Sequence, residues 1–182
     1  MPEIKKHLFL TGDKQVGKST LLRRLIEARQ LDCAGFETQA FYLNGERRGF
    51  TLHGRVDMPP YENDCICCAR IGEQKAAPVL ETFSQNGVNI LQKSLEAPNP
   101  FILMDEIGRL ESRSEAFCAQ VIKTLDADKR VLGVLQKCSS QLVNQIMNRD
   151  DVTVITVTSE NREELLKALC EAYKGNDRGC RP

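Results

Sequence analysis

Residues 12–19 read Gly12-Asp13-Lys14-Gln15-Val16-Gly17-Lys18-Ser19, the complete G-x-x-x-x-G-K-S pattern of a phosphate-binding loop. An apolar run at residues 8–10 precedes the loop, and a stretch with helical spacing begins at Thr20. The pattern works only between a strand and a helix, and both are expected here. A chance glycine-rich turn would not have four fixed positions in that context. We therefore expect residues 12–20 to bind a nucleoside triphosphate.

The fixed residues of the loop have separate roles in holding phosphate. Gly12 and Gly17 permit backbone angles that a side chain would penalise, so successive N–H groups can surround an anion. The helix that begins near Gly17 adds unpaired N–H groups and the positive end of its dipole. Lys18 can reach the β- and γ-phosphates, and the Ser19 hydroxyl is placed to ligate Mg²⁺, the expected cofactor.

The composition limits the classes of protein to which the chain can belong. Its 182 residues suit one domain, expected over residues 1–174 with a flexible tail at 175–182. Basic and acidic residues number 25 each, so no general basic field favours nucleic acid as a partner. No apolar run is long enough to span a membrane, and no signal-peptide hydrophobic region leads into the first strand. We expect a cytoplasmic protein whose eight cysteines are mostly reduced.

Strands and helices alternate along the chain. Two β-prone runs, 35–42 and 48–52, flank Asn44-Gly45, a strong hairpin signal, and the polar stretch 56–77 reads as a long loop. The remaining spacing predicts helices at 79–95 (broken at Asn86-Gly87), 114–125 and 141–147, and strands at 101–104, 131–135 and 152–157. A last helix, with Leu165, Leu166 and Leu169 in the core, would start at a capping box of Asn161 and Glu164.

This order of elements predicts the fold class. Strands joined through helices form a mainly parallel sheet with helices on both faces. Together with the phosphate-binding loop, the pattern indicates a three-layer α/β fold of the P-loop NTPase class. We expect the loop to lie at the carboxyl edge of the sheet, where ligands of such folds bind.

Asp105 and Glu106 follow the apolar run 101–104 and complete the expected site. At the carboxyl edge of a parallel sheet, Asp105 would emerge beside the loop and hold Mg²⁺ together with Ser19. Glu106, one residue further, is the natural group to orient and partly deprotonate the attacking water. An isolated Asp-Glu pair after a strand is more often a solvated turn. The complete loop upstream makes the catalytic interpretation the better one.

Phosphoryl transfer also needs cations near the γ-phosphate. The candidates are Arg70, Arg109, Arg149 and Arg162, and for each of them an ordinary surface charge is the simpler explanation. Guanine specificity is usually carried by an N-K-x-D stretch after a late strand. Residues 158–162 read Thr-Ser-Glu-Asn-Arg instead, so strict GTP selectivity is disfavoured.

Several stretches resemble, in the same order, the small nucleoside triphosphatase family found in thermophiles and, in animals, as the cancer-related nucleoside triphosphatase. They are residues 12–20, 35–50, 70–72, 83–88, 105–111 and 151–162, of which Asp-Glu-Ile-Gly-x-x-Glu at 105–111 is the most specific. The resemblance implies a RecA-like fold and slow, Mg²⁺-dependent hydrolysis of several NTPs, including ATP and GTP, to NDP and phosphate. It also implies the roles assigned above to Lys18, Ser19, Asp105 and Glu106. Asp13-Lys14-Gln15 departs from the Pro-rich, Gly-containing loop interior usual in that family.

Cys65, Cys67 and Cys68 are a larger departure from that family. The C-x-C-C stretch looks like the motif of CobW-type metallochaperone GTPases. Three thiolates within four residues can occupy three tetrahedral positions around Zn²⁺ or another soft ion. A fourth ligand would come from His53, Cys33 or Cys138. The alternative is a set of reduced cysteines, or a redox-sensitive cluster, in an exposed loop.

Three functions follow from these patterns. The first is an NTP hydrolase, a nucleoside-triphosphate phosphohydrolase. The second is a nucleotide-gated metal carrier with a metalloprotein client, in which the cysteines at 65–68 hold the cargo. The third, a nucleotide or nucleoside kinase, is disfavoured because Glu106 suits water activation and no Arg-rich lid segment is evident.

Overall fold

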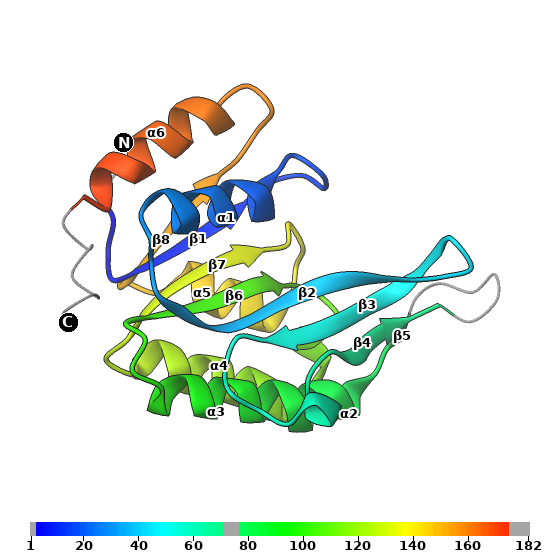
Figure 1. Cartoon of the computed structure of the whole chain (residues 1–182). Coiled ribbons are helices and arrows are strands. Elements are labelled where there is room, and N and C mark those ends of the chain that lie inside the picture. The colour runs from blue at the N-terminus through cyan, green and yellow to red at the C-terminus, as the bar shows by residue number, and fades with distance from the viewer. Residues whose placement is uncertain (1–2, 71–76, 175–182) are drawn as a thin grey trace.

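Eight strands form one sheet in the computed structural model, which describes residues 3–70 and 77–174 (Figure 1). Across the sheet their order is β5-β4-β3-β2-β6-β7-β1-β8. In chain order the strands are β1 His7–Thr11, β2 Cys33–Leu43, β3 Glu46–Gly54, β4 Cys65–Ala69, β5 Ala77–Pro78, β6 Phe101–Ile107, β7 Arg130–Leu135 and β8 Val152–Thr156. The expected tail at 175–182 lies outside the described residues.

The half of the sheet that carries the phosphate-binding loop is parallel. β2, β6, β7, β1 and β8 pair in parallel, and β7 lies between β1 and β6. The other half, β2 to β5, is antiparallel, and its β2–β3 hairpin projects beyond the sheet (Figure 1). The mainly parallel sheet predicted from the sequence is confirmed, with an antiparallel extension on one side.

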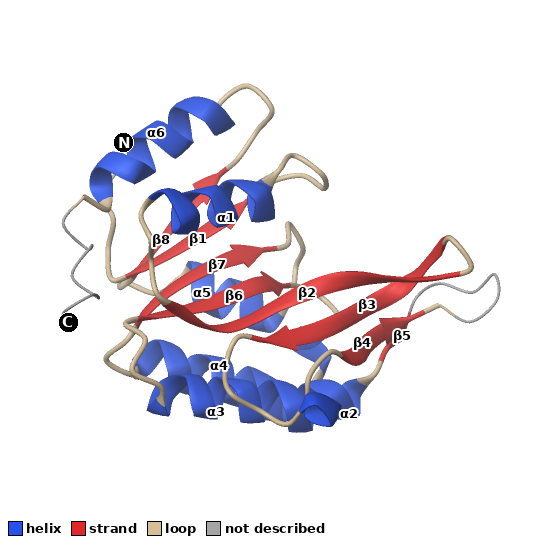
Figure 2. Cartoon of the chain, viewed as in Figure 1, coloured by secondary structure: helices blue, strands red, loops and turns tan. Residues whose placement is uncertain are grey.

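Helices cover both faces of the sheet (Figure 2). α1 (Lys18–Ala28) and α6 (Arg162–Ala172) pack on one face, and α3 (Val88–Glu96), α4 (Glu115–Asp126) and α5 (Gln141–Met147) pack on the other. β1 shows why, because successive side chains of a strand point to opposite faces. Leu8 and Leu10 lie in the core under α1 and α6, whereas Phe9 lies in the core under α3 to α5. Two buried layers therefore enclose the sheet, as the predicted three-layer fold requires.

Several short sequence patterns predicted the local structure correctly. Asn44 and Gly45 have φ of 53° and 79°, the left-handed angles of a tight hairpin turn, and they join β2 to β3 as predicted. The helix at 141–147 has the expected bounds, and Leu165, Leu166 and Leu169 are buried. Ser114 caps α4 by accepting a hydrogen bond from the Phe117 N–H.

Three predictions about local structure were wrong. The expected loop at 56–77 contains a 3₁₀ turn (η1, Pro60–Glu62) and strand β4. The expected break at Asn86-Gly87 is a π-helical segment (η2, Phe83–Gly87) that joins α2 (Leu80–Thr82) to α3 without interruption. Asn161 does not form a capping box. Its side chain instead accepts from the Thr158 N–H and donates to the Thr156 carbonyl, which fixes the turn before α6.

In the described ranges, 3–70 and 77–174, no helix is both long enough and apolar enough to cross a membrane.

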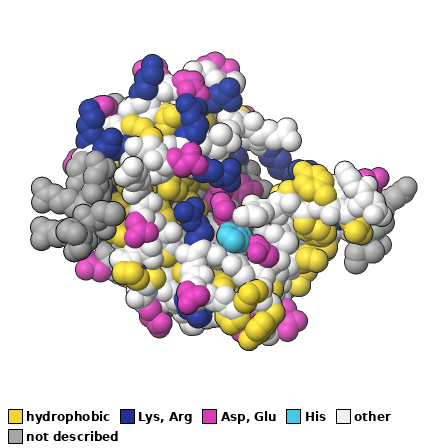
Figure 3. All heavy atoms as spheres, viewed as in Figure 1, with side chains coloured by type: hydrophobic (Ala, Val, Ile, Leu, Met, Phe, Trp, Pro, Cys, Tyr) yellow, Lys and Arg dark blue, Asp and Glu magenta, His cyan; other side chains and the backbone are white. Residues whose placement is uncertain are grey.

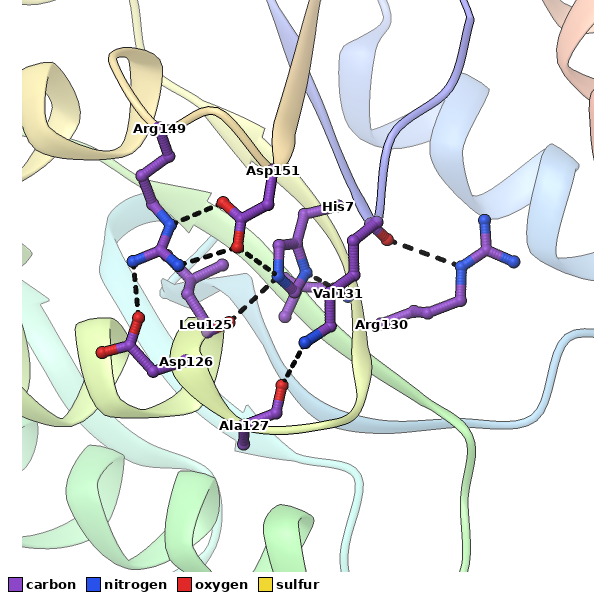
Figure 4. A network of polar contacts seen from close by, with 9 residues as sticks. His7, Leu125, Asp126, Ala127, Arg130, Val131, Arg149 and Asp151 are labelled. Atoms are coloured by element: carbon purple, nitrogen blue, oxygen red, sulfur yellow. Dashed lines mark hydrogen bonds and ion pairs between the residues drawn. The ribbon is translucent and has the colours of Figure 1, made fainter.

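A buried polar network lies at the amino ends of the parallel strands, on the side of the sheet opposite the phosphate-binding loop (Figure 4). The His7 ring is fully buried, with Nε2 3.0 Å from the Leu125 carbonyl and Nδ1 accepting from the Val131 N–H. Asp151 lies 3.6 Å from the same ring and is held by Arg149. Burial lowers the pKa of His7 to about 4, so the ring is neutral and both of its nitrogens are paired.

Replacing His7 with leucine is expected to lower the free energy of unfolding at pH 7.5 by about 2–4 kcal/mol, because two buried backbone groups lose their partner. The difference in the free energy of unfolding between the wild type and this variant should shrink as the pH falls from 6.5 to 4. In that window the unfolded histidine binds a proton and the folded one does not, so up to about 3 kcal/mol is lost. Urea unfolding of both proteins at pH 7.5 and 4.5 measures this, and a constant difference between them would contradict it.

Candidate functional site

The phosphate-binding loop joins the carboxyl end of β1 to the start of α1, as predicted. Gly12 has φ of 140°, and a Cβ there would lie 2.3 Å from the Val157 carbonyl oxygen, so no other residue fits. Gly17 has φ of 95° and directly precedes α1, and Gln15 is also left-handed at 64°. These angles give the loop the tight turns that a phosphate cradle needs.

Lys18 lies folded over the loop that contains it. Its side chain is buried, and Nζ donates to the carbonyls of Gly12 at 3.0 Å and of Asp13 at 2.8 Å. The ammonium group is therefore held at the mouth of the loop by two backbone oxygens. The backbone of the loop itself thus orients this cation.

Ser19 and Asp105 join the loop to the acidic strand. The Ser19 hydroxyl donates to Asp105 Oδ1 at 2.8 Å, although the two residues are 86 positions apart. Asp105 is the fifth residue of β6 and is 7% exposed. The pKa of Asp105 is raised to about 6, chiefly by burial and also by the nearby Glu106 and Glu37 carboxylates, while the hydrogen bond from Ser19 opposes the increase. A buried carboxylate beside like charges and a hydroxyl is an oxygen donor set that favours a hard divalent cation.

Glu106 lies near the end of β6 and contacts the residue that follows the neighbouring strand, β7. Gln136, the residue after β7, donates through Nε2 to Glu106 Oε1 at 3.3 Å. Glu111 is buried, and its carboxylate accepts from the Gly108 N–H at 2.9 Å, so it fixes the turn that follows β6. Burial raises the pKa of Glu111 to about 7. Glu106 is thus half-buried, and one of its carboxylate oxygens is hydrogen-bonded.

Several residues of the site were missed by sequence reasoning. Glu37 on β2 pairs in register with Asp105, and its carboxylate lies 3.6 Å from the Arg23 guanidinium. Gln136 and Lys137 follow β7, which separates the two halves of the site. Acidic and basic side chains gather in the recess between the body of the molecule and the projecting hairpin (Figure 3). Nothing in the local pattern marks these residues, because strand register alone brings them to the site.

The four candidate arginines lie in different places. Arg149 is held by Asp126 and Asp151 at the opposite edge of the sheet, so it is not a cation of this site. Arg162 lies beside the loop, where a Cβ on Gly17 would be 3.6 Å from its Nη1. The Arg109 N–H donates to the Gln136 side chain, and Arg70 follows β4.

The cysteines at 65–68 are packed into the sheet and do not form an exposed metal-binding loop. Ile66 pairs with Thr51 and Cys68 with Phe50, so Cys67 is the extra residue of a β-bulge. The bulge buries both Cys67 and Cys68 in the core. Burial raises the pKa of the Cys67 thiol to about 12 and also raises that of Cys68, whereas metal ligation needs thiolates.

The candidate fourth ligands do not complete a metal centre either. His53 is hydrogen-bonded to Asp64, and Cys33 is buried in the core on the α1 side of the sheet, away from Cys67 and Cys68. Within residues 3–70 and 77–174, no three His, Cys, Asp or Glu side chains are grouped so that they could hold a metal ion. The metal-carrier interpretation, with Cys65, Cys67 and Cys68 as ligands, is therefore not favoured.

These features together define the class of protein. A phosphate-binding loop after β1, an acidic strand β6 separated from it by β7, and helices on both faces make a P-loop NTPase of the α/β type. The model of a family described as NTPase matches residues 7–170, so the chain belongs to that family. The resemblance seen in the sequence is confirmed, and with it the classification of the chain as a nucleoside triphosphatase.

Known relatives agree with this assignment. The nucleoside-triphosphatase THEP1 of Thermotoga petrophila is 34% identical over 179 residues, which cover 93% of each chain. A solution structure of a human cancer-related nucleoside triphosphatase is similar with a TM-score of 0.68 at 30% identity, covering 92% of this chain and 97% of that one. The crystal structure of THEP1 from Aquifex aeolicus has a TM-score of 0.72 at 22% identity, covering 92% and 99%, and supports the fold alone.

Proposed function

We propose that the chain hydrolyses nucleoside triphosphates, ATP and GTP among them, slowly and with Mg²⁺, to the nucleoside diphosphate and phosphate. The observation that carries the proposal is the 2.8 Å hydrogen bond from Ser19 to Asp105. It joins the end of the phosphate-binding loop to a buried carboxylate, and these two oxygen ligands are what a magnesium–triphosphate complex requires. Membership of the NTPase family supports the same reaction.

Each loop residue has a proposed part in binding. The backbone of residues 12–20, with the start of α1, surrounds the phosphates, and Lys18 neutralises the β- and γ-phosphates. Ser19 and Asp105 would hold Mg²⁺, which supplies positive charge to the oxygens of the phosphate that is transferred. The buried Asp105 carboxylate beside Glu37 and Glu106 fits this role, because a divalent cation would offset the like charges gathered there.

Glu106 is the proposed general base. A water held by its carboxylate attacks the γ-phosphorus, a new P–O bond forms, and the bond between the γ-phosphorus and the β,γ-bridging oxygen breaks. The proton of that water passes to Glu106, and the diphosphate leaves with the electron pair. The hydrogen bond from Gln136 fixes one oxygen of Glu106 and leaves the other to accept from water.

We also propose a cellular location, a domain organisation and a range of nucleotides for the chain. The cysteines of the described residues are free thiols, as proteins of the reducing cytoplasm usually have, so we place the chain there. The described strands belong to one sheet, which supports a single domain over residues 1–174. The stretch at 158–162 carries no guanine signature, which supports the use of several nucleotides.

The direct test is phosphate release from ATP and GTP with Mg²⁺ and no added acceptor. Hydrolysis predicts one phosphate and one diphosphate for each triphosphate consumed, and chelation of Mg²⁺ should abolish the release. A kinase would leave the triphosphate intact until a nucleoside or nucleotide acceptor is supplied. Release only after addition of an acceptor would therefore replace the hydrolase with the kinase.

A further inference from the structure

Asp13, the second residue of the phosphate-binding loop, is the meeting point of two ammonium groups. Lys18 Nζ lies 2.8 Å from its carbonyl oxygen, and Lys137 Nζ lies 2.9 Å from its carboxylate oxygen Oδ1. The hydrogen bond and charge of Lys137 lower the pKa of Asp13, so the carboxylate is ionised. An anion of the protein therefore lies where two cations converge at the mouth of the loop.

Lys137 lies at the carboxyl ends of the central strands, beside the phosphate-binding loop. It follows β7, and β7 is hydrogen-bonded to β1 on one side and to β6 on the other. The loop follows β1, and β6 carries Asp105 and Glu106. Lys137 contacts the loop, and its neighbour Gln136 contacts Glu106. These two residues thus span the gap between the phosphate-binding half and the water-activating half of the site.

We propose that Asp13 holds Lys137 in place of a phosphate, and that Lys137 exchanges Asp13 for the γ-phosphate when a triphosphate binds. The proposal rests on the proposed function and adds a cation that the sequence did not reveal. Lys137 would then be a catalytic residue, since it touches the group that is transferred. Asp13, at which the loop departs from the pattern usual in the family, would then have the role of holding Lys137.

The exchange is physically easy. The side chains of Lys137 and Asp13 are 70% and 74% exposed, and ion pairs so open to solvent contribute little to stability. A bound triphosphate brings several negative charges and more acceptor oxygens than one carboxylate. The four-carbon stem of lysine lets Nζ move between the two without movement of the backbone. A cation at this position offsets the charge on the γ-phosphate oxygens in the transition state.

Lys137→Met tests the proposal through binding and through turnover. Affinity for a non-hydrolysable triphosphate should fall about tenfold, because a charge-assisted hydrogen bond is lost, while affinity for the diphosphate should change less than about twofold. The kcat of hydrolysis should fall about tenfold or more. Lys137→Arg should keep most of the selectivity for triphosphate.

Asp13→Asn provides an independent test. Because the internal competitor is removed, triphosphate binding should tighten by about two- to fivefold, and this gain should vanish in the Lys137→Met background. Lys174→Met is the matched control, since Lys174 also pairs with an exposed acid, Glu171, and lies just beyond the C-terminal end of α6. All of these variants should unfold at the wild-type temperature, because each removes only exposed groups.

The outcomes separate this proposal from the hydrolase assignment. If Lys137→Met equals the wild type in both triphosphate affinity and turnover, Lys137 is only a surface ion pair and the proposal fails. Equal weakening of triphosphate and diphosphate binding would also overturn it. If the wild type releases no phosphate but Lys137→Met still weakens triphosphate binding selectively, the contact stands and the hydrolase assignment fails.

Discussion

Glu106→Gln is expected to bind the triphosphate with affinity within about twofold of the wild type and to hydrolyse it about 10²–10⁴ times more slowly. The substitution keeps the size of the side chain and its carbonyl oxygen, so the hydrogen bond donated by Gln136 can still form. What it removes is the ability to take a proton from water. Single-turnover phosphate release, measured beside equilibrium nucleotide binding, separates the two effects.

The control for this variant is Glu163→Gln. Glu163 is an exposed acid on α6 that pairs with Arg24, so its loss should leave hydrolysis unchanged. Full activity in Glu106→Gln would end the water-activation assignment. The carboxylate to test next would then be Glu37, which lies opposite Asp105 in the sheet. Glu37→Gln distinguishes the roles of Glu37 and Glu106, since we expect it to weaken the binding of Mg²⁺ rather than to abolish hydrolysis.

The residues of the candidate site whose position in the fold could be predicted from the sequence are those defined by short stretches of chain. Gly12, Gly17 and Lys18 belong to one continuous loop whose geometry is imposed by its own backbone angles. Asp105 follows an apolar run of the buried parallel type, and such a run in a P-loop protein has few places in the sheet where it can lie. Its contact with Ser19 could therefore be anticipated although 86 residues separate the two.

The parts that were missed depend on which strands become neighbours. Glu37 lies within an ordinary β-prone run, and only its register with β6 places it beside Asp105. Lys137 has an unremarkable local sequence and reaches the loop because β7 inserts between β1 and β6. Strand order is decided by long-range packing, which no window of local sequence records.

The cysteines at 65–68 show that a local pattern can also predict a site that the fold does not form. Read as a spacing, C-x-C-C predicts a metal-binding loop because three thiols lie within four residues. In the fold, the stretch is a strand with one extra residue, and the bulge buries Cys67 and Cys68 beneath the sheet. Pro59-Pro60 and the polar residues around them hid this strand, since they made the whole segment read as a loop. A motif is informative only in the structural context that its chemistry needs.

Lys18→Ala is expected to have the largest effect on nucleotide binding. The ammonium group of Lys18 is fixed by the backbone of the loop, through the carbonyls of Gly12 and Asp13. Its removal takes a full positive charge from beside the proposed position of the β- and γ-phosphates. We expect triphosphate affinity to fall about tenfold or more, and hydrolysis to fall about 10²–10³-fold, because the charge matters more as the bond to the γ-phosphate breaks.

The loop itself should survive the loss of Lys18. Gly12 and Gly17 keep their backbone angles without the ammonium group, and water can enter the space that the buried side chain leaves and bind the two carbonyls. The melting temperature should therefore stay near that of the Lys174→Met control, and isothermal titration with a non-hydrolysable triphosphate gives the affinity. Wild-type affinity in a folded Lys18→Ala protein would show that the phosphates bind elsewhere. A loss equal to that of Lys137→Met, with full additivity in the double variant, would show that the two lysines act on the phosphates independently.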